Sequence, residues 1–467
     1  MKILMFSINP LYKSYVTGGA SKHIKNISAF LGQSGHEVTI LCTRSETNAD
    51  PFVWSENVLV KPILPYKQPF PSPYSITAGD LAFICETVNI HLDGSDKFYI
   101  HDGEFLLPFL HEKIPTIISY RDNVYPESIL GSFISNGDQI IAVSRYSSDV
   151  INFTAGRFFP ELEDRITIIP NGIDFDRFRP KRTQEIAKKL GVDISKDVVI
   201  LHPHRQEVGK GLIQTIRVVE LLLRKFKLSN VKILVPEWIS EMASTEDRSF
   251  YKQIESHLDQ KGLRDHFIFH SWLSQELMPA YYSLGNLTLC LGSFVEAFGN
   301  VAYESLACGT PSIVARVGVH RTMLPDNLIH KVDYDDIDTA AEIAYQIIKT
   351  HQKLSKDEID NIKPYFSLEN QVNGYLHIIE NCKKEKKMDF LPIKLDINTK
   401  YKLAPWCSIG NKGVYHDFRN KYYDDPLLLQ TFQTQGQYIN NNDLSILGGG
   451  EKVLSNWYQE TIIVPVL

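Results

Sequence analysis

Residues 287–316 read LTLCLGSFVEAFGNVAYESLACGTPSIVAR. The apolar run Leu287–Leu291 predicts a buried strand, and Ser312–Arg316 predicts a second one. Between them lie a loop and a helix-like stretch, Val301–Cys308. A strand, a loop, a helix and another strand in this order are typical of a sheet with parallel strands, so this stretch predicts an α/β fold.

Both ends of the expected helix carry boundary signals. Asn300 is a good N-cap residue, because its side-chain oxygen can accept a hydrogen bond from an unpaired backbone N–H group of the first turn. Gly309 fits the left-handed position that often follows a helix, and Pro311 bars continuation. We therefore expect Asn300 to cap the helix and Gly309 to end it.

Two carboxylates accompany this unit, Glu296 in the loop and Glu304 in the helix. Ligands of open α/β sheets bind at the carboxyl ends of the strands, and a helix N-terminus there attracts a phosphate. Carboxylates accept hydrogen bonds from hydroxyl groups, in which sugars and riboses are rich. The arrangement predicts a site for a phosphate flanked by hydroxyl-bearing groups.

The pattern EAFGNVAYE, from Glu296 to Glu304, resembles the E-x7-E signature of the family 4 glycosyltransferases, which have the GT-B fold. Phe298, Gly299 and Gly309 also stand where that family has the same residue types. Two glutamates eight positions apart would otherwise fit an ordinary solvated helix. The resemblance therefore depends on the composite pattern.

The composition is that of a soluble globular protein. The 467 residues allow two or three domains, with 43% hydrophobic and 22% charged residues. The net charge is −6, so the chain lacks the excess of basic residues that is typical of nucleic-acid-binding proteins. The six cysteines lie far apart without a C-x-x-C motif, which predicts reduced thiols rather than disulfides or a zinc site. No apolar run reaches the ~18 residues of a membrane helix.

The chain begins with a predicted βαβ unit. The strand Lys2–Ile8 is followed by Gly18 and Gly19, a helix, and the strand Val38–Cys42. Glycine lets a backbone approach a ligand closely, but the spacing is not G-x-G-x-x-G, so a nicotinamide fingerprint is absent. The glycine pair resembles the family's N-terminal glycine loop, which lies between donor phosphate and acceptor.

Two predicted strands of the N-terminal half end in polar pairs. The first pair, His101-Asp102, matches the family pattern, which often reads H-D there. The second, Arg121-Asp122, departs from the family's H-D because an arginine replaces the histidine. Arginine cannot act as a base at neutral pH, but it can bind an anion or a hydroxyl group.

A basic loop follows the predicted strand Val198–His202. Arg205 and Lys210 could clamp a diphosphate with charge-assisted hydrogen bonds at a helix start. They match the family pattern G-R-x-x-x-x-K-G, except that His204 replaces the first glycine. Farther on, His270 replaces a glycine whose loop meets the nucleotide base, so the base is not readable from this sequence.

These features predict two Rossmann-like domains that face a central cleft, as in the GT-B fold. Residues 1–185 would form the acceptor domain, to which a crossover helix at 364–382 returns. Residues 186–363 would bind the nucleotide sugar. Residues 388–467 form an extension of unknown role, whose aromatic content argues against a disordered tail.

The resemblance implies a retaining glycosyltransferase, with a UDP-sugar as the default donor and a glycan, lipid-linked or small-molecule hydroxyl as the acceptor. No cofactor, metal or nucleic-acid partner is expected, and bacterial surface polysaccharide synthesis is one fitting setting. The expected location is the cytoplasm, with peripheral contact at the inner membrane face left open.

The implied catalytic residues are Glu296, Arg205, Lys210 and His101. The implied donor-binding residues are Gly18, Gly19, Arg205, Lys210, His270, Glu296, Ala297, Phe298, Gly299, Asn300, Val301 and Glu304. Arg121 and Asp122 are candidates for the acceptor side.

Two other classes fit part of the sequence. A partner subunit that keeps the fold without the chemistry is favoured by Arg121, His270 and the altered segment at 319–321. A sugar-nucleotide epimerase on the same fold would change the sugar of its donor without any acceptor. Release of nucleoside diphosphate on addition of acceptors would identify the transferase.

Overall fold

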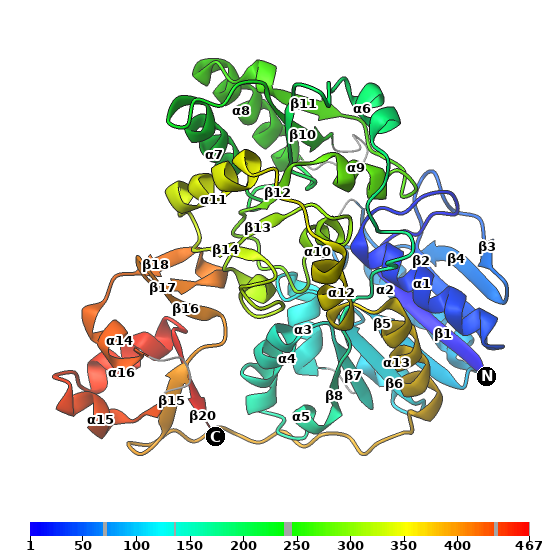
Figure 1. Ribbon diagram of the computed structural model, residues 1–467. Coiled ribbons are helices and arrows are strands. Elements are labelled where there is room, and N and C mark those ends of the chain that lie inside the picture. Colours follow the sequence, from blue (N-terminus) through cyan, green and yellow to red (C-terminus); the bar gives the residue numbers. More distant parts are fainter. Residues whose placement is uncertain (69–71, 135–136, 238–244, 434–437, 467) are drawn as a thin grey trace. The chain divides into compact units, whose positions relative to one another are not determined.

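The computed structural model describes residues 1–68, 72–134, 137–237, 245–433 and 438–466 (Figure 1). The chain forms two compact units. The first unit comprises Met1–Gln68, Ser72–Ile169 and residues 374–466, and the second unit comprises Pro170–Asn373. The predicted α/β class is confirmed in both units, since each contains a mainly parallel sheet with helices between its strands.

The first unit is built on an eight-stranded sheet of order β3-β4-β2-β1-β5-β6-β7-β8. All neighbouring strands are parallel except the edge pair β3 and β4. Its strands are β1 (Lys2–Ser7), β2 (Glu37–Thr43), β3 (Phe52–Ser55), β4 (Val58–Leu64), β5 (Lys97–His101), β6 (Thr116–Tyr120), β7 (Gln139–Ala142) and β8 (Ile166–Ile168). Its helices include α1 (Gly19–Gln33), α2 (Ala78–Leu92), α3 (Pro126–Ile134), α4 (Arg145–Asn152) and α5 (Leu162–Arg165).

The second unit is built on a six-stranded parallel sheet of order β11-β10-β9-β12-β13-β14. Its strands are β9 (Val198–Leu201), β10 (Val231–Pro236), β11 (Phe267–His270), β12 (Leu287–Cys290), β13 (Ser312–Ala315) and β14 (His330–Val332). Its helices are α6 (Gln184–Leu190), α7 (Leu212–Arg224), α8 (Thr245–Lys261), α9 (Met278–Leu284), α10 (Asn300–Ala307), α11 (Ile337–Lys349) and α12 (Lys356–Ile362). The strand–loop–helix–strand unit predicted from residues 287–316 is thus confirmed as β12, α10 and β13.

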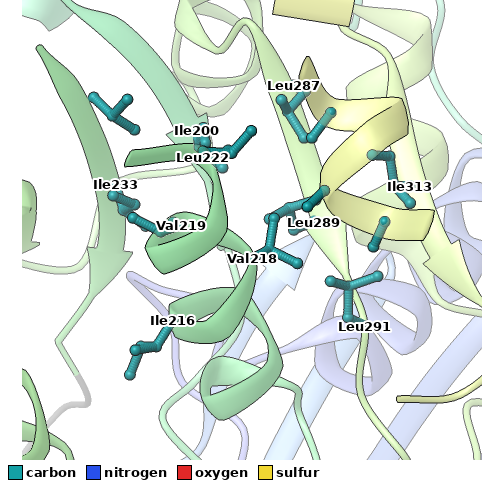
Figure 2. Packing of buried hydrophobic residues seen from close by; sticks show 14 of the residues in the cluster. Ile200, Ile216, Val218, Val219, Leu222, Ile233, Leu287, Leu289, Leu291 and Ile313 are labelled. Atoms are coloured by element: carbon teal, nitrogen blue, oxygen red, sulfur yellow. The ribbon is translucent and has the colours of Figure 1, made fainter. Parts of the chain in front are cut away.

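The sheet of the second unit is covered by apolar helix faces. Figure 2 shows Ile216, Val219 and Leu222 of α7 beside Ile200 and Ile233 of the central strands. All five side chains are fully buried. Strands that are buried on both faces read as continuous apolar runs, which explains why the sequence reveals these strands clearly.

The crossover helix lies close to its expected place. The helix α13 (Leu368–Asn381) follows a 3₁₀ turn at Lys363–Tyr365 instead of beginning at Pro364. The side chain of Ser367 accepts a hydrogen bond from the backbone N–H of Asn370 at 3.1 Å, which fixes this later start.

The described residues of the C-terminal extension form helices and strands and belong to the first unit. The extension contains two three-stranded antiparallel sheets, β19-β15-β20 and β16-β17-β18. The aromatic side chains of Trp457 and Phe432 are buried within it. Its elements are β15 (Lys400–Leu403), β16 (Cys407–Gly410), β17 (Gly413–His416), β18 (Lys421–Tyr423), α14 (Pro426–Thr431), β19 (Tyr438–Ile439), α15 (Asn441–Ile446), α16 (Glu451–Gln459) and β20 (Ile463–Val466).

Candidate functional site

Two loops of the second unit meet at the carboxyl ends of the neighbouring strands β9 and β12. The backbone N–H of Phe294 donates to the carbonyl oxygen of Gly209 at 3.0 Å. A Cβ atom on Gly211 would lie 2.5 Å from the backbone nitrogen of Gly292, and a Cβ on Gly292 would overlap the Gly209 carbonyl. The glycines therefore allow the two backbones to touch, which brings the side chains of both loops to one place.

Lys210 and Glu296 form an ion pair at this junction. The Lys210 Nζ atom lies 2.8 Å from Glu296 Oε1, and the two side chains keep 11% and 23% of their surface exposed. The same ammonium group lies 3.4 Å from the centre of the Phe294 ring. Burial raises the pKa of Glu296, but the charge and hydrogen bond of Lys210 outweigh it and leave the pKa below its ordinary value. The Glu296 carboxylate is therefore charged at neutral pH.

Arg205, the second predicted cation, lies in the same basic loop. Its Nε atom is 3.0 Å from Glu207 Oε1, with about a third of the Arg205 side chain exposed. Its guanidinium also contributes to lowering the pKa of Glu296. Both predicted cations thus lower the pKa of the Glu296 carboxylate.

The start of α10 differs from its expected form. The N-cap is Gly299, which has a left-handed φ of 79° and gives no side-chain cap, so the prediction that Asn300 caps the helix is wrong. Asn300 is the first helical residue, and its Oδ1 accepts a hydrogen bond from Asn171 Nδ2 at 3.0 Å. The Asn300 side chain is thus engaged with another segment, and Gly299 offers no side-chain acceptor to the first backbone N–H groups of α10.

A histidine that sequence reasoning did not select explains the need for glycine at 299. The buried His320 ring occupies the space that a Cβ atom of Gly299 would enter. The Tyr303 hydroxyl holds this ring at 3.0 Å from Nδ1, and the backbone N–H of Val319 donates to the Glu296 carbonyl at 3.1 Å. Burial lowers the pKa of His320 to about 4, so the ring is neutral at pH 7.

The remaining predicted residues of this loop and helix have distinct surroundings. Ala297 and Phe298 are buried, and the Phe298 ring packs edge-on against Tyr303 at 5.4 Å. Val301 is partly exposed in the first turn of α10. Glu304 lies one turn on and accepts a hydrogen bond from the Tyr282 hydroxyl at 3.1 Å. The side chains of Ala297 and Phe298 are thus packed inside the protein.

His270 is held within the core of the second unit. Its Nδ1 atom lies 2.9 Å from the Ser271 carbonyl oxygen, and its Nε2 atom lies 3.4 Å from the Tyr281 hydroxyl. Burial lowers the pKa of the ring. The imidazole is therefore neutral at pH 7. It is buried and holds the loop that follows β11 through its contact with Ser271.

Five predicted residues of the first unit lie around the carboxyl ends of β5 and β6 and the start of α1. Gly18 and Gly19 are exposed, with Gly18 as the N-cap of α1. His101 is buried, and its Nε2 atom lies 3.1 Å from the Ala20 carbonyl oxygen. Burial and the nearby Arg121 hold the pKa of His101 well below its ordinary value. His101 is therefore a neutral group that supports the start of α1.

Arg121 is buried beside Asp102 rather than projecting into solvent. Arg121 Nε lies 3.8 Å from Asp102 Oδ1, and both side chains are at least nine-tenths buried. Arg121 Nη1 also lies 3.5 Å from the Tyr375 hydroxyl. Burial raises the pKa of Asp102 to about 6, although the guanidinium of Arg121 acts in the opposite direction.

Asp122 organises the turn that leads into α3. Its Oδ1 atom accepts hydrogen bonds from the backbone N–H groups of Val124 and Tyr125, both at 3.0 Å. Its Oδ2 atom accepts one from Ser128 Oγ at 2.7 Å. Burial and the nearby Asp102 carboxylate raise the pKa of Asp122 to about 6. The carboxylate is thus occupied by its own chain.

The structure also bears on metals, thiols and membranes. Among the described residues, no group of three or more His, Cys, Asp or Glu side chains could hold a metal ion. All six cysteines are free thiols. In the part of the chain that the structure describes, no helix is both long and apolar enough to cross a membrane.

Comparison with family models and curated proteins agrees with the sequence pattern. Residues 183–363 match the model for glycosyl transferases group 1, and residues 17–177 match that for glycosyltransferase family 4. The D-inositol 3-phosphate glycosyltransferase of Xylanimonas cellulosilytica is 27% identical over 171 residues, which are 35% of this chain and 38% of that protein. The uncharacterized glycosyltransferase MJ1607 of Methanocaldococcus jannaschii is 24% identical over 341 residues, 68% of this chain and 81% of that protein. The match to the first of these relatives thus spans little more than a third of its length.

Solved structures share the fold at low sequence identity. Sucrose-phosphate synthase from Thermosynechococcus elongatus has a TM-score of 0.66 and 16% identity, over 81% of this chain and 98% of that one. Anabaena HepE in complex with UDP and glucose has a TM-score of 0.63 and 16% identity, over 81% and 99% of the two chains. With the two matched family models and the Glu296–Glu304 pattern, these findings show that the chain belongs to the group 1, or family 4, glycosyltransferases and has their GT-B fold of two Rossmann-like domains.

Proposed function

We propose that this protein is a retaining glycosyltransferase that moves a sugar from a nucleotide-sugar donor to a hydroxyl group of an acceptor. The observation that carries the proposal is the ion pair of Lys210 and Glu296 at the junction of two strand-end loops. It sets a cation from the loop after β9 against a carboxylate of the loop that leads to the start of α10, and both side chains are still partly exposed. A nucleotide sugar requires both, because it carries a diphosphate and hydroxyl groups.

The first step is binding of the diphosphate. The unpaired N–H groups at the start of α10 carry a partial positive charge that favours an anion. Lys210 and Arg205 add two full positive charges, which are balanced by Glu296 and Glu207 in the free protein. An arriving diphosphate competes for these cations, and Glu296 becomes available to accept from hydroxyl groups of the donor sugar. Glu304, held by Tyr282, is assigned to the ribose hydroxyls.

The second step is departure of the nucleoside diphosphate. The bond between the anomeric carbon and the diphosphate oxygen breaks, and its electron pair stays on the diphosphate. The cations stabilise the charge that develops there, and the acceptor hydroxyl attacks the anomeric carbon from the same face. Attack from the face that the diphosphate leaves retains the anomeric configuration. The hydroxyl proton passes to the departing diphosphate, so the charges balance. No metal is part of this proposal.

UDP-sugars are the default donors, supported by the structurally similar HepE of Anabaena, which was solved in complex with UDP and glucose. The acceptor is a glycan, a lipid-linked sugar or a small molecule, as in the synthesis of surface polysaccharides. Six free thiols agree with action in the reducing cytoplasm, at or near the inner face of a membrane.

A thermal-shift screen with UDP-, GDP- and ADP-glucose tests the proposal. A donor that binds only the folded protein at about 100 times its Kd adds about 2.7 kcal/mol of apparent stability. We expect one nucleotide to raise the Tm clearly and Glu304→Ala to weaken that effect by about tenfold in Kd. The matched control is Glu342→Ala, an exposed carboxylate of the same unit that pairs with Lys225. If none of the three donors shifted the Tm, the donor-binding role would be wrong.

A further inference from the structure

The first unit contains a cavity of about 300 Å³ that involves the C-terminal extension. Its walls come from the end of β6, from α3 and α4, and from the segments around β17 and β20. The family models stop at residue 363, so the extension's share of the wall lies outside the matched regions. The residues that this share contributes are Trp406, His416, Phe418, Arg419 and Thr461.

Most polar groups in the cavity walls form hydrogen bonds with other groups of the protein. Ser132 Oγ donates to the Ile129 carbonyl at 2.7 Å, and Thr154 Oγ1 donates to the Val150 carbonyl at 2.6 Å. Such bonds turn the hydroxyl groups back toward their own helices and leave the carbon atoms of α3 and α4 to face the cavity.

The polar groups that the extension contributes to the cavity wall also form hydrogen bonds within the protein. Trp406 Nε1 donates to the Thr461 carbonyl at 2.8 Å, and His416 Nε2 lies 3.0 Å from Thr461 Oγ1. The Trp406 and Phe418 rings pack edge-on at 5.9 Å. A ligand in the cavity would therefore meet mainly aromatic and aliphatic carbon. Among the described lining residues Arg419 is the one cation, and its Nη1 atom lies 3.2 Å from Glu460 Oε2.

The extension is firmly attached where it forms this wall. The Tyr146 hydroxyl donates to the buried Asp417 Oδ2 at 2.7 Å. The Lys402 ammonium lies 3.6 Å from the centre of the Phe153 ring. These contacts join the extension to α4 and the residue that follows it, so the cavity is a built feature of one unit rather than a gap beside a loose tail.

The cavity also reaches the ligand-binding edge of the sheet. Tyr120 is the last residue of β6, and Asp122 and Asn123 follow it into the loop. Ligands of parallel α/β sheets bind at this end of the strands. At the rim, Phe418 and Ile129 remain 40% and 42% exposed, which leaves an apolar way in from solvent.

We propose that this cavity binds the apolar group of the acceptor, so that the extension selects acceptors that carry a hydrocarbon chain or an aromatic ring next to the sugar or hydroxyl that reacts. The inference depends on the proposed function. A volume of about 300 Å³ is at the lower end of the range for small-molecule sites, so it accommodates one ring system or a short length of chain.

Ligand-observed NMR titrations with two probes test this inference. Octyl β-D-glucoside, used below its critical micelle concentration, represents a chain, and phenyl β-D-glucoside represents a ring. We expect at least one probe to bind. Binding of the octyl glucoside would indicate an acceptor with a hydrocarbon chain, and binding of the phenyl glucoside would indicate one with an aromatic ring. Methyl β-D-glucoside, which lacks an apolar group, is expected to bind at least tenfold more weakly.

Two variants locate the binding. Ser132→Phe fills the cavity from α3 and is expected to weaken probe binding at least tenfold. Ile134→Phe, on the same helix but outside the lining, is expected to leave it unchanged. Should Ser132→Phe fail to fold, Phe418→Ala removes a partly exposed wall and is expected to weaken binding severalfold. Its control is Phe109→Ala, which truncates an exposed ring elsewhere in the unit.

The result that overturns the inference is binding of neither probe, or equal binding by wild type and the cavity-filling variant. A UDP-glucose titration of the same samples keeps the two proposals distinguishable. If the wild-type protein binds UDP-glucose but neither probe, the acceptor pocket alone is refuted. Probe binding without binding of any nucleotide sugar refutes the proposed function, and the cavity then remains an apolar binding site of another kind.

Discussion

The two units hold charged clusters of opposite character. In the second unit, Lys210 and Glu296 form an ion pair that is partly exposed, with Arg205 and Glu207 close by. In the first unit, Asp102 and Arg121 are almost fully buried. A partly exposed pair can exchange its partner for a ligand at little cost, whereas a buried pair cannot be separated without leaving a charge in the core. The first cluster is therefore suited to binding, and the second to holding strand ends in place.

Among the variants that test this difference between the two clusters, Lys210→Ala is expected to lose the most activity. We expect nucleoside diphosphate release at saturating donor to fall by about 100-fold or more, because a cation that stabilises the leaving group is removed. The Tm is expected to change little, since the pair retains solvent contact. Measurement of kcat together with a melting curve checks both parts. Full activity in the variant would remove Lys210 from the leaving-group site.

The next largest effect, now on stability, is expected for Arg121→Ala. Removal of this guanidinium leaves the buried Asp102 carboxylate without its charged neighbour, which costs about 3–5 kcal/mol. Hydrogen exchange is expected to become faster at the ends of β5 and β6, while the strands of the second unit stay protected. A variant with unchanged exchange but lost activity would instead assign Arg121 to the acceptor.

A smaller, pH-dependent effect is expected for Asp122→Asn. The pKa of Asp122 in the folded protein is about 6, above the ordinary value of 3.8, so folding takes up a proton in this range. The associated stability is fully present below about pH 4 and is lost as the pH rises through about 6. The variant lacks this loss, so its stability relative to wild type should rise by at most about 3 kcal/mol between pH 4 and pH 7.5. Melting curves at several pH values check the trend, and a constant difference would contradict it.

The smallest effect is expected for Lys225→Ala. Lys225 Nζ lies 3.4 Å from Glu342 and 3.6 Å from Asp338, and all three side chains are about half exposed or more. Such surface pairs contribute about 0–1 kcal/mol. Activity and donor binding are expected to equal those of wild type, which makes this variant the matched lysine control for Lys210. A loss of turnover here would show that the activity depends on overall charge rather than on the Lys210 position.

The fold was predictable because it depends on local patterns. Buried parallel strands such as β12 and β13 appear as apolar runs, and Gly309, with a φ of 82°, ends α10 as expected. The N-cap was predicted wrongly because the decisive contact is not local. The His320 ring comes from a later loop and occupies the space beside Gly299, which favours glycine in a left-handed conformation at that position.

The extension was less predictable for a related reason. Its short antiparallel strands are held by tertiary contacts, such as the hydrogen bond from Tyr146 to Asp417, that no sequence period indicates. The convergence of Lys210 with Glu296 was inferred from their strand-end positions, and the structure adds that they are paired in the free protein. The cavity beside α3 and α4 could not be inferred, since its lining residues are scattered over much of the chain.

The most direct test of the central claim is a crystal structure of this protein with UDP bound. We expect the diphosphate to lie within hydrogen-bond distance of Lys210 Nζ and of the first backbone N–H groups of α10, with Glu296 released from its present pairing. A nucleotide bound elsewhere, with the Lys210–Glu296 pair still intact at 2.8 Å, would contradict it.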